Sequence, residues 1–97
     1  GGRMIIVAGW IRLRAGARED YLAGCRPVIE AARSAPGCLD FTLSADPIDP
    51  ERINVFERWE SDAALEAFRG TGPDEDQTSA IRDAQVSRYR IAAVEPA

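Results

Sequence analysis

The chain has 97 residues, of which 45% are hydrophobic and 29% charged, the composition of one small globular domain. Because a chain of this length buries only about 60–65% of its unfolded surface, we expect the fold to recruit a second subunit. No apolar run approaches the roughly 20 residues of a membrane-spanning helix, and no segment resembles a signal peptide. We therefore expect no membrane partner and a cytoplasmic location, with the domain spanning residues 4–95 and residues 1–3 a cloning remnant.

The ionisable residues exclude several kinds of chemistry. The 12 basic residues are all arginine and stand against 16 acidic ones, and the net charge of −4 argues against a nucleic-acid partner. The absence of lysine excludes Schiff-base chemistry, and the absence of histidine removes the usual general base and metal ligand. Cys25 and Cys38 form no CxxC motif, so we expect two thiols rather than a zinc or redox site, although a disulfide between them stays open.

The first half of the chain is predicted to begin with a strand followed by a helix. Residues 4–13 are largely β-favouring and apolar on both faces. From Ala17 the apolar period changes to that of a helix. The stripe of that helix consists of Tyr21, Leu22, Cys25, Val28, Ile29 and Ala32. Pro27 lies within the stripe, so we expect a kink or a missing hydrogen bond there, and Pro36-Gly37 ends the helix.

Two alternating segments follow, and they are predicted to pair as an antiparallel hairpin. In residues 38–45 the apolar face carries Leu39, Phe41 and Leu43. A rigid turn at residues 46–50, rich in aspartate and proline, leads to a second strand at residues 52–60. One face of this strand carries Ile53, Val55, Glu57 and Trp59, and the other carries Asn54, Phe56 and Arg58.

The last part of the chain is predicted to hold a short helix, a further helical turn and a strand. Ser61 is a good N-cap for the helix. The apolar residues of that helix are Ala64, Leu65 and Phe68. Pro73 is predicted to open the further turn, which Ile81 and Ala84 would anchor, and residues 86–94 form the last strand. The predicted order of elements is therefore βαββαβ.

This order is typical of a ferredoxin-like α+β fold, in which helices cover one face of a four-stranded antiparallel sheet. The first strand is apolar on both faces, so the face without helices also needs burial. A second copy of the sheet would provide it, and we therefore expect a homodimer with a two-fold axis.

Four short motifs carry a family resemblance. They are Pro36-Gly37-Cys38-Leu39-Asp40-Phe41, Asp46-Pro47 with Pro50 and Arg52, Glu57-Arg58-Trp59-Glu60-Ser61, and Ala64-Leu65-Glu66. Together with the opening strand and Arg26-Pro27, they resemble the antibiotic biosynthesis monooxygenase (ABM) family over roughly residues 4 to 94. The resemblance implies a dimeric α/β barrel of ferredoxin-like subunits. The family includes cofactor-free oxygenases of polyphenolic or quinol-type substrates, haem-degrading members and small-molecule isomerases.

The haem-degrading members of this family carry three further residues. These are an Asn on the first strand, a Trp at the end of the third strand and a His on the helical segment that follows. By position, Trp59 matches the Trp, the Asn position falls on Gly9, and the His has no counterpart in this chain. The comparison implies a protein that does not degrade haem, and we expect no cofactor.

Trp59 and Glu57 are the candidate catalytic residues. Trp59 could stack on an aromatic substrate in a dry pocket, or it could seat the second helix on the sheet. If Glu57 is buried, desolvation raises its pKa and makes it a plausible proton acceptor. The alternative for Glu57 is an ion pair with Arg88 or Arg90 on the last strand.

The candidate substrate-binding residues supply hydroxyl, amide, guanidinium or aromatic groups. They are Tyr21, Phe68, Tyr89, Asn54 and Arg58. A tyrosine or phenylalanine on an apolar helix stripe is more often part of the core. Asn54 and Arg58 fall on the face opposite Glu57 and could instead pair across the dimer. No metal site is predicted, because the acidic residues 74–76 lack a second set of ligands.

The resemblance and the absence of cofactor motifs together favour a cofactor-independent monooxygenase that oxidises a small aromatic, polyphenolic or quinol-type metabolite. A deprotonated phenol or anthrone can itself reduce oxygen, so the protein must supply an apolar pocket, orientation and stabilisation of the phenolate. The alternative is a non-catalytic or isomerase-like dimeric small-molecule-binding protein of the same fold. An RNA-binding module shares the order of elements, but this chain lacks its basic surface and its paired aromatic motif.

Overall fold

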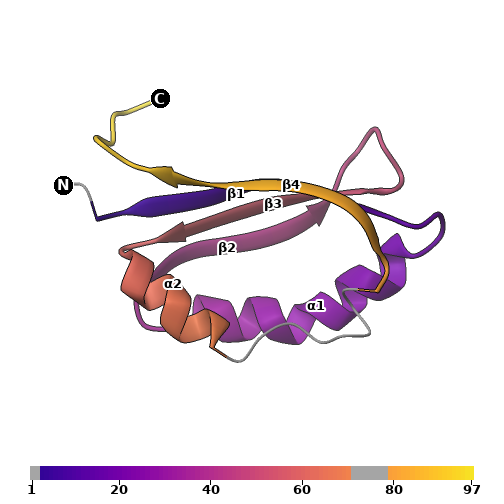
Figure 1. Ribbon diagram of the computed structural model, residues 1–97, viewed down its shortest axis with the longest axis horizontal. Coiled ribbons are helices and arrows are strands. Elements are labelled where there is room, and N and C mark those ends of the chain that lie inside the picture. The colour runs from indigo at the N-terminus through magenta and orange to yellow at the C-terminus, as the bar shows by residue number, and fades with distance from the viewer. Residues whose placement is uncertain (1–2, 71–78) are drawn as a thin grey trace.

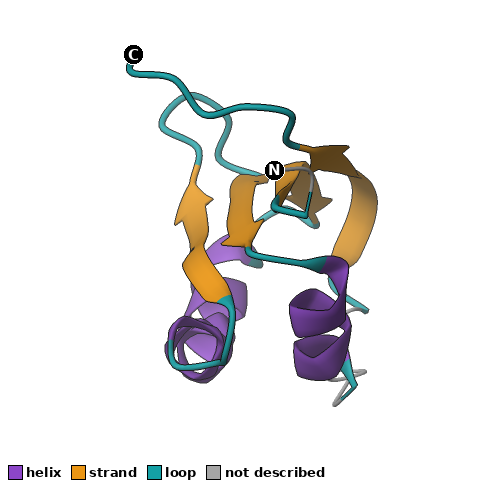
Figure 2. Ribbon diagram, turned by 90° about the vertical axis from the view of Figure 1, so that its left-hand side faces the viewer, coloured by secondary structure: helices purple, strands orange, loops and turns teal. Residues whose placement is uncertain are grey.

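The computed structural model describes residues 3–70 and 79–97, which form four strands and two helices. In chain order these are β1 (Ile5–Leu13), α1 (Arg18–Arg33), β2 (Cys38–Ala45), β3 (Arg52–Trp59), α2 (Asp62–Arg69) and β4 (Ile81–Arg90). The strands form one antiparallel sheet in the order β2-β3-β1-β4, and both helices lie beneath the same face of it (Figures 1 and 2). The predicted ferredoxin-like α+β fold is confirmed.

The register of the strands sorts their side chains onto two faces. Residues directly opposite each other in neighbouring strands share a face, and successive residues of one strand alternate between faces. We call the side that α1 and α2 cover the helix-covered face, and the opposite side the open face (Figures 1 and 2). Two neighbouring rows of paired residues on the helix-covered face are Glu57–Val7–Arg88 and Val55–Gly9–Val86. In both rows the middle residue belongs to β1, the strand between β3 and β4.

Two clusters of buried side chains fill the space between the sheet and the helices. The first consists of Ile5, Val7, Ala32, Phe41, Trp59 and Leu65. The second consists of Ile11, Leu13, Ile53 and Val55. The predicted cap of α2 forms, because the Ser61 hydroxyl accepts a hydrogen bond from the Ala64 N–H. This start to the helix brings Leu65 into the first cluster, where it is fully buried.

Strand β2 differs from the prediction at one residue. Leu39 is predicted to share the buried face with Phe41, but 43% of its surface is exposed. The pairing of β2 with β3 shifts register between Cys38 and Asp40, so β2 contains a bulge at this point. The extra residue of a bulge leaves the regular alternation, and for this reason Leu39 does not join the core.

Strand β4 corrects the prediction for the last part of the chain. It spans Ile81–Arg90 rather than residues 86–94, so Ile81 and Ala84 are strand residues and not anchors of a helical turn. Ala84 pairs with Ile11, and this pairing with β1 extends the sheet toward the turn after β1. The helical turn predicted at Pro73 lies outside the described residues.

Helix α1 is continuous from Arg18 to Arg33 although it contains Pro27. A proline has no N–H, so the helix lacks one backbone hydrogen bond at this position. Cys25 and Ala32, on either side of the proline, are buried against the sheet, and this packing stabilises the helix across the missing bond.

Two further expectations concern the cysteines and the membrane. Cys25 is buried and Cys38 half-buried, and the two do not form a disulfide. Neither α1 nor α2 is long and apolar enough to cross a membrane.

Candidate functional site

Glu57 on β3 is the charged residue that the described part of the chain buries, with 8% of its surface exposed. Its Oε1 accepts a hydrogen bond from the indole Nε1 of Trp59 at 2.9 Å. Burial raises the pKa of Glu57, and the Trp59 hydrogen bond and the charges of Arg69 and Arg88 offset part of that rise. A buried carboxylate with a raised pKa is a stronger base than an exposed one, which suits proton abstraction.

The alternative for Glu57, an ion pair with Arg88 or Arg90 of the last strand, is not formed. Arg88 instead binds two carboxylates of α2, Asp62 at 2.7 Å and Glu66 at 2.8 Å. Arg90 binds Asp62 at 2.6 Å. Asp62 and Glu66 are four residues apart and so lie on the same side of α2, from which both reach β4. The carboxylates of α2 therefore replace Glu57 as the partners of Arg88 and Arg90.

Trp59 is fully buried in an aromatic group that joins α2 to the sheet. Its ring centroid lies 5.5 Å from that of Phe68, and Phe68 meets Phe41 edge-on at 5.9 Å. Ring contacts at these distances keep the Trp59 indole in one orientation, and its N–H donates the hydrogen bond to the Glu57 carboxylate. The structure thus brings together Trp59, Glu57 and Phe68 of the predicted site, and Trp59 does seat the second helix on the sheet.

Gly9 leaves the helix-covered face without a side chain beside Glu57. A Cβ at this residue would lie 1.9 Å from the Gln85 carbonyl oxygen, and the φ of +155° is rare for other residues. The asparagine that haem-degrading members carry here has no room in this backbone. Its neighbour in the row, Val86, is 41% exposed. We call Gly9 and Val86 the apolar step: they lie on the same face as Glu57, in the sheet row next to the Glu57 row. A glycine inside a strand, with no side chain to pack, is a signal that the sequence offered for this feature.

Tyr21 on α1 packs against the second cluster, which contains Val55 of the Gly9 row. Burial raises the pKa of Tyr21 to about 12, and charge and hydrogen-bond interactions with Cys25 add to the rise. The phenol is therefore protonated at neutral pH and acts as a hydrogen-bond donor. Of the predicted binding residues, Tyr21 and Phe68 lie on the same side of the sheet as Glu57.

Three predicted binding residues lie on the open face. They are Asn54, Arg58 and Tyr89. Asn54 accepts a hydrogen bond from Arg52 at 2.6 Å and donates one to Asp46 at 2.9 Å. Tyr89 is 54% exposed. Because the sheet lies between these residues and Glu57, the two sets do not meet in this chain.

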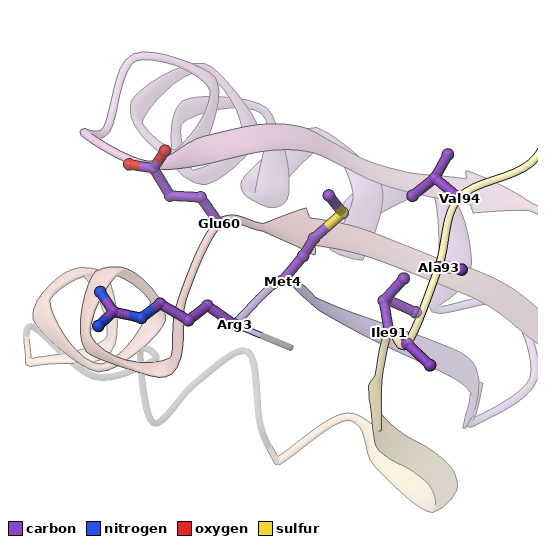
Figure 3. A pocket seen from close by; sticks show the side chains of 7 residues that line it. Arg3, Met4, Glu60, Ile91, Ala93 and Val94 are labelled. Carbon is purple, nitrogen blue, oxygen red and sulfur yellow. The ribbon is translucent and has the colours of Figure 1, made fainter. Parts of the chain in front are cut away.

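A separate hollow of about 420 Å³ lies at one end of the sheet, beside the chain segment that follows β4 (Figure 3). It is lined by Arg3, Met4, Glu60, Ile91, Ala92, Ala93 and Val94. None of the predicted site residues lines this hollow, so we do not assign it to the candidate site. Across residues 3–70 and 79–97, no three His, Cys, Asp or Glu side chains gather closely enough to hold a metal ion.

The sequence model of one family, described as antibiotic biosynthesis monooxygenase, matches residues 4–85. The chain belongs to this family. The resemblance predicted from the four motifs is thereby confirmed. A relative of this ABM chain, an uncharacterized protein from Synechocystis, is 34% identical over 62 residues. That match covers 64% of the ABM chain and 42% of the relative, so the chain spans less than half of the relative's length.

Two solved structures illustrate the fold that the ABM chain shares with other proteins. A protein from Pseudomonas aeruginosa is 24% identical with a TM-score of 0.79, over 95% of this chain and 97% of that one. A heme-degrading protein from Mycobacterium tuberculosis is 24% identical with a TM-score of 0.68, over 100% of both chains. At this level of identity the likeness establishes the fold of the ABM chain and not its substrate.

Proposed function

We propose that this ABM protein is a cofactor-independent monooxygenase that oxidises a small aromatic, polyphenolic or quinol-type metabolite. The observation that carries the proposal is the buried Glu57, which Trp59 orients and which lies beside the apolar step of Gly9 and Val86. Membership of the ABM family supports the reaction class. One base in apolar surroundings suits a reaction in which the substrate itself supplies the electrons to oxygen.

Glu57 is the proposed general base. Its carboxylate removes a proton from an activated CH or OH group, and the surrounding aromatic side chains limit access of water to the anion that forms. The anion then adds oxygen and the O–O bond breaks. A methylene carbon plus one molecule of oxygen become a carbonyl plus one molecule of water, so no external reductant is needed.

The remaining helix-side residues orient the base and the substrate. Trp59 fixes one carboxylate oxygen of Glu57, and Phe68 holds the indole in place. The protonated phenol of Tyr21 is the proposed donor to the developing phenolate. A hydrogen-bond donor aimed at developing charge is worth about 10²–10³ in rate.

Oxygen uptake tests this proposal. We expect the purified protein to accelerate oxygen consumption by anthrones or hydroquinones, and Glu57→Gln to lower the rate constant about 10²–10⁴-fold. Glutamine keeps an oxygen that can accept the Trp59 hydrogen bond, so the variant preserves the fold. The control is Glu60→Gln, which removes an exposed carboxylate three residues along the chain. Uptake that no substrate stimulates, or that Glu57→Gln leaves unchanged, would contradict the proposal.

A second candidate function, isomerase-like proton transfer in a small-molecule-binding protein, is favoured by Glu57 itself, because proton abstraction requires no oxygen. Incubation in heavy water without oxygen separates the two. Exchange of a substrate hydrogen for deuterium, combined with no oxygen uptake in air, would assign the isomerase-like function. Exchange together with uptake supports the monooxygenase.

We also propose that the protein is a homodimer whose subunits pack through their open faces. Phe56 and Tyr89 are 37% and 54% exposed on this face. Trp10 lies on the same face, with the guanidinium carbons of Arg12 and Arg52 at 5.7 and 5.8 Å from its ring. An exposed apolar patch framed by polar groups is typical of an interface, and one patch can pair with its own copy around a two-fold axis. Light scattering of the purified protein tests the expected mass of two chains.

A further inference from the structure

Arg88 shares a sheet row with Glu57, and both arms of its guanidinium are engaged by α2. Val7 lies between Glu57 and Arg88 in this row. Nη1 of Arg88 lies 2.7 Å from Asp62 Oδ1, and Nη2 lies 2.8 Å from Glu66 Oε1. An arginine at the edge of a binding site otherwise recognises a carboxylate or phosphate on a ligand with these same two arms. Here that capacity is used within the protein.

The ion pairs between β4 and α2 add no net charge near Glu57. Arg88 and Arg90 carry two positive charges, and their partners Asp62 and Glu66 carry two negative ones, so this group cancels. Arg69 also acts on Glu57 and offsets part of its negative charge, but Arg69 lies at the exposed surface whereas Glu57 is buried.

The Glu57 carboxylate therefore remains as the buried charge beside the apolar step of Gly9 and Val86. It accepts a neutral hydroxyl and repels an anion. Discrimination between ligands commonly depends on such a repulsive element.

We propose that Asp62 and Glu66 determine the charge of the ligand, because by occupying Arg88 they make the site accept an uncharged hydroxyaromatic ring and reject its carboxylated analogue. The inference rests on the proposed function for the position of the site and adds the selection of substrate. Asp62 and Glu66 act through Arg88 and do not touch the reacting atoms.

Binding of two matched rings tests the inference without requiring turnover. Hydroquinone is uncharged, and gentisate is hydroquinone with one added carboxylate. In equilibrium dialysis at neutral pH and low salt, we expect the wild type to bind hydroquinone more tightly. Glu66→Ala releases one arm of Arg88. We expect it to shift relative affinity toward gentisate about tenfold, the effect of one charge-assisted hydrogen bond. The shift should shrink in 1 M salt, where the Debye length is about 3 Å.

Two controls separate this mechanism from a general change in charge. Glu30→Ala makes the same change in net charge by removing the exposed partner of Arg26 on α1, a 3.1 Å ion pair, and should leave the ratio of affinities unchanged. Adding Arg88→Met to Glu66→Ala should abolish the gain for gentisate. Circular dichroism of each variant is the check that the variant is folded.

The outcomes distinguish this inference from the proposed function. An unchanged ratio in Glu66→Ala, or a gain that persists without Arg88, would overturn the inference while oxygen uptake could still be observed. No oxygen uptake, with the ratio shifting as described, would overturn the monooxygenase and leave the charge selection intact. Failure of the wild type to bind either ring would overturn the inference.

Discussion

The two tryptophans of this protein show how differently the sheet uses its two faces. Trp59 is fully buried on the helix-covered face and donates its N–H to Glu57. Trp10 lies on the open face, with the guanidinium groups of Arg12 and Arg52 near its ring. Both residues are tryptophans on strands whose side chains alternate between the two faces. The residue type therefore does not determine which face each one occupies. The difference teaches that the alternation of side chains along a strand decides whether a tryptophan joins the core beneath the helices or the open face, the surface proposed for association.

The largest contrast should appear in stability. Trp59→Ala is expected to lower the free energy of unfolding by about 3–5 kcal/mol, because it opens a cavity next to Phe68 and removes the donor to Glu57. That loss should be the same at all protein concentrations. Trp10→Ala should instead cause a loss that is largest at high protein concentration and shrinks as the protein is diluted, since its role is at the proposed interface and dimerisation stabilises by mass action. Urea unfolding at two protein concentrations measures the loss of stability in both variants. If the two losses depend on protein concentration in the same way, the proposed difference between the two faces is wrong.

The next effect concerns association. Phe56→Asp places an unpaired charge at the centre of the open face, and we expect the dimer dissociation constant to rise at least about 100-fold. The side chain points away from both helices, so the monomer should keep its circular dichroism spectrum. Sedimentation velocity measures the change, with Ile48→Asp in an exposed turn as the control. A Phe56→Asp protein that stays dimeric would exclude the open face as the interface.

The smallest effect is a dependence of stability on pH. The pKa of Glu57 is raised in the folded state, so between the ordinary glutamate value and this raised value the folded protein binds a proton that the unfolded chain releases. Stability should therefore be highest below this range and fall as the pH rises through it. The proposed activity needs the carboxylate and should rise over the same range.

Denaturation curves of Glu57→Gln, measured at a series of pH values, should not show this fall of stability with rising pH. Asp62 is the comparison of opposite sign, because hydrogen bonds from Arg90 and Arg88 lower its pKa. Its contribution to stability is present above the ordinary aspartate value and is lost as the pH falls through the lowered one. If Glu57→Gln keeps the wild-type slope, the raised pKa of Glu57 is not its origin.

Most of the fold could be predicted from the sequence because its signals are local. The alternation in residues 52–60 places Glu57 and Trp59 on one face without any knowledge of their partners, and Ser61 marks the start of α2. The bulge at Leu39 and the start of β4 at Ile81 depend on pairing with other strands. Such pairing leaves little trace in a short local pattern.

The site was predictable in part for the same reason. Glu57 lies between apolar residues of β3, from which its burial follows, and the sequence predicts a raised pKa only if the residue is buried, as it is here. The partners of Arg88 could not be predicted, because they depend on where α2 packs against the sheet. The family resemblance identifies Gly9 by the asparagine it replaces, whereas the close approach of Gly9 to Gln85 depends on the β1–β4 pairing.

That close approach also limits how this scaffold can be re-engineered. A designer who wished to graft the amide of a haem-degrading relative onto the first strand would find that Gly9→Asn drives the new side chain into the main chain of β4. The neighbouring strand would have to be rebuilt before any new function could be installed there. Directed evolution of this protein should therefore find its useful changes more readily at Val86, which is 41% exposed and has space for a larger side chain.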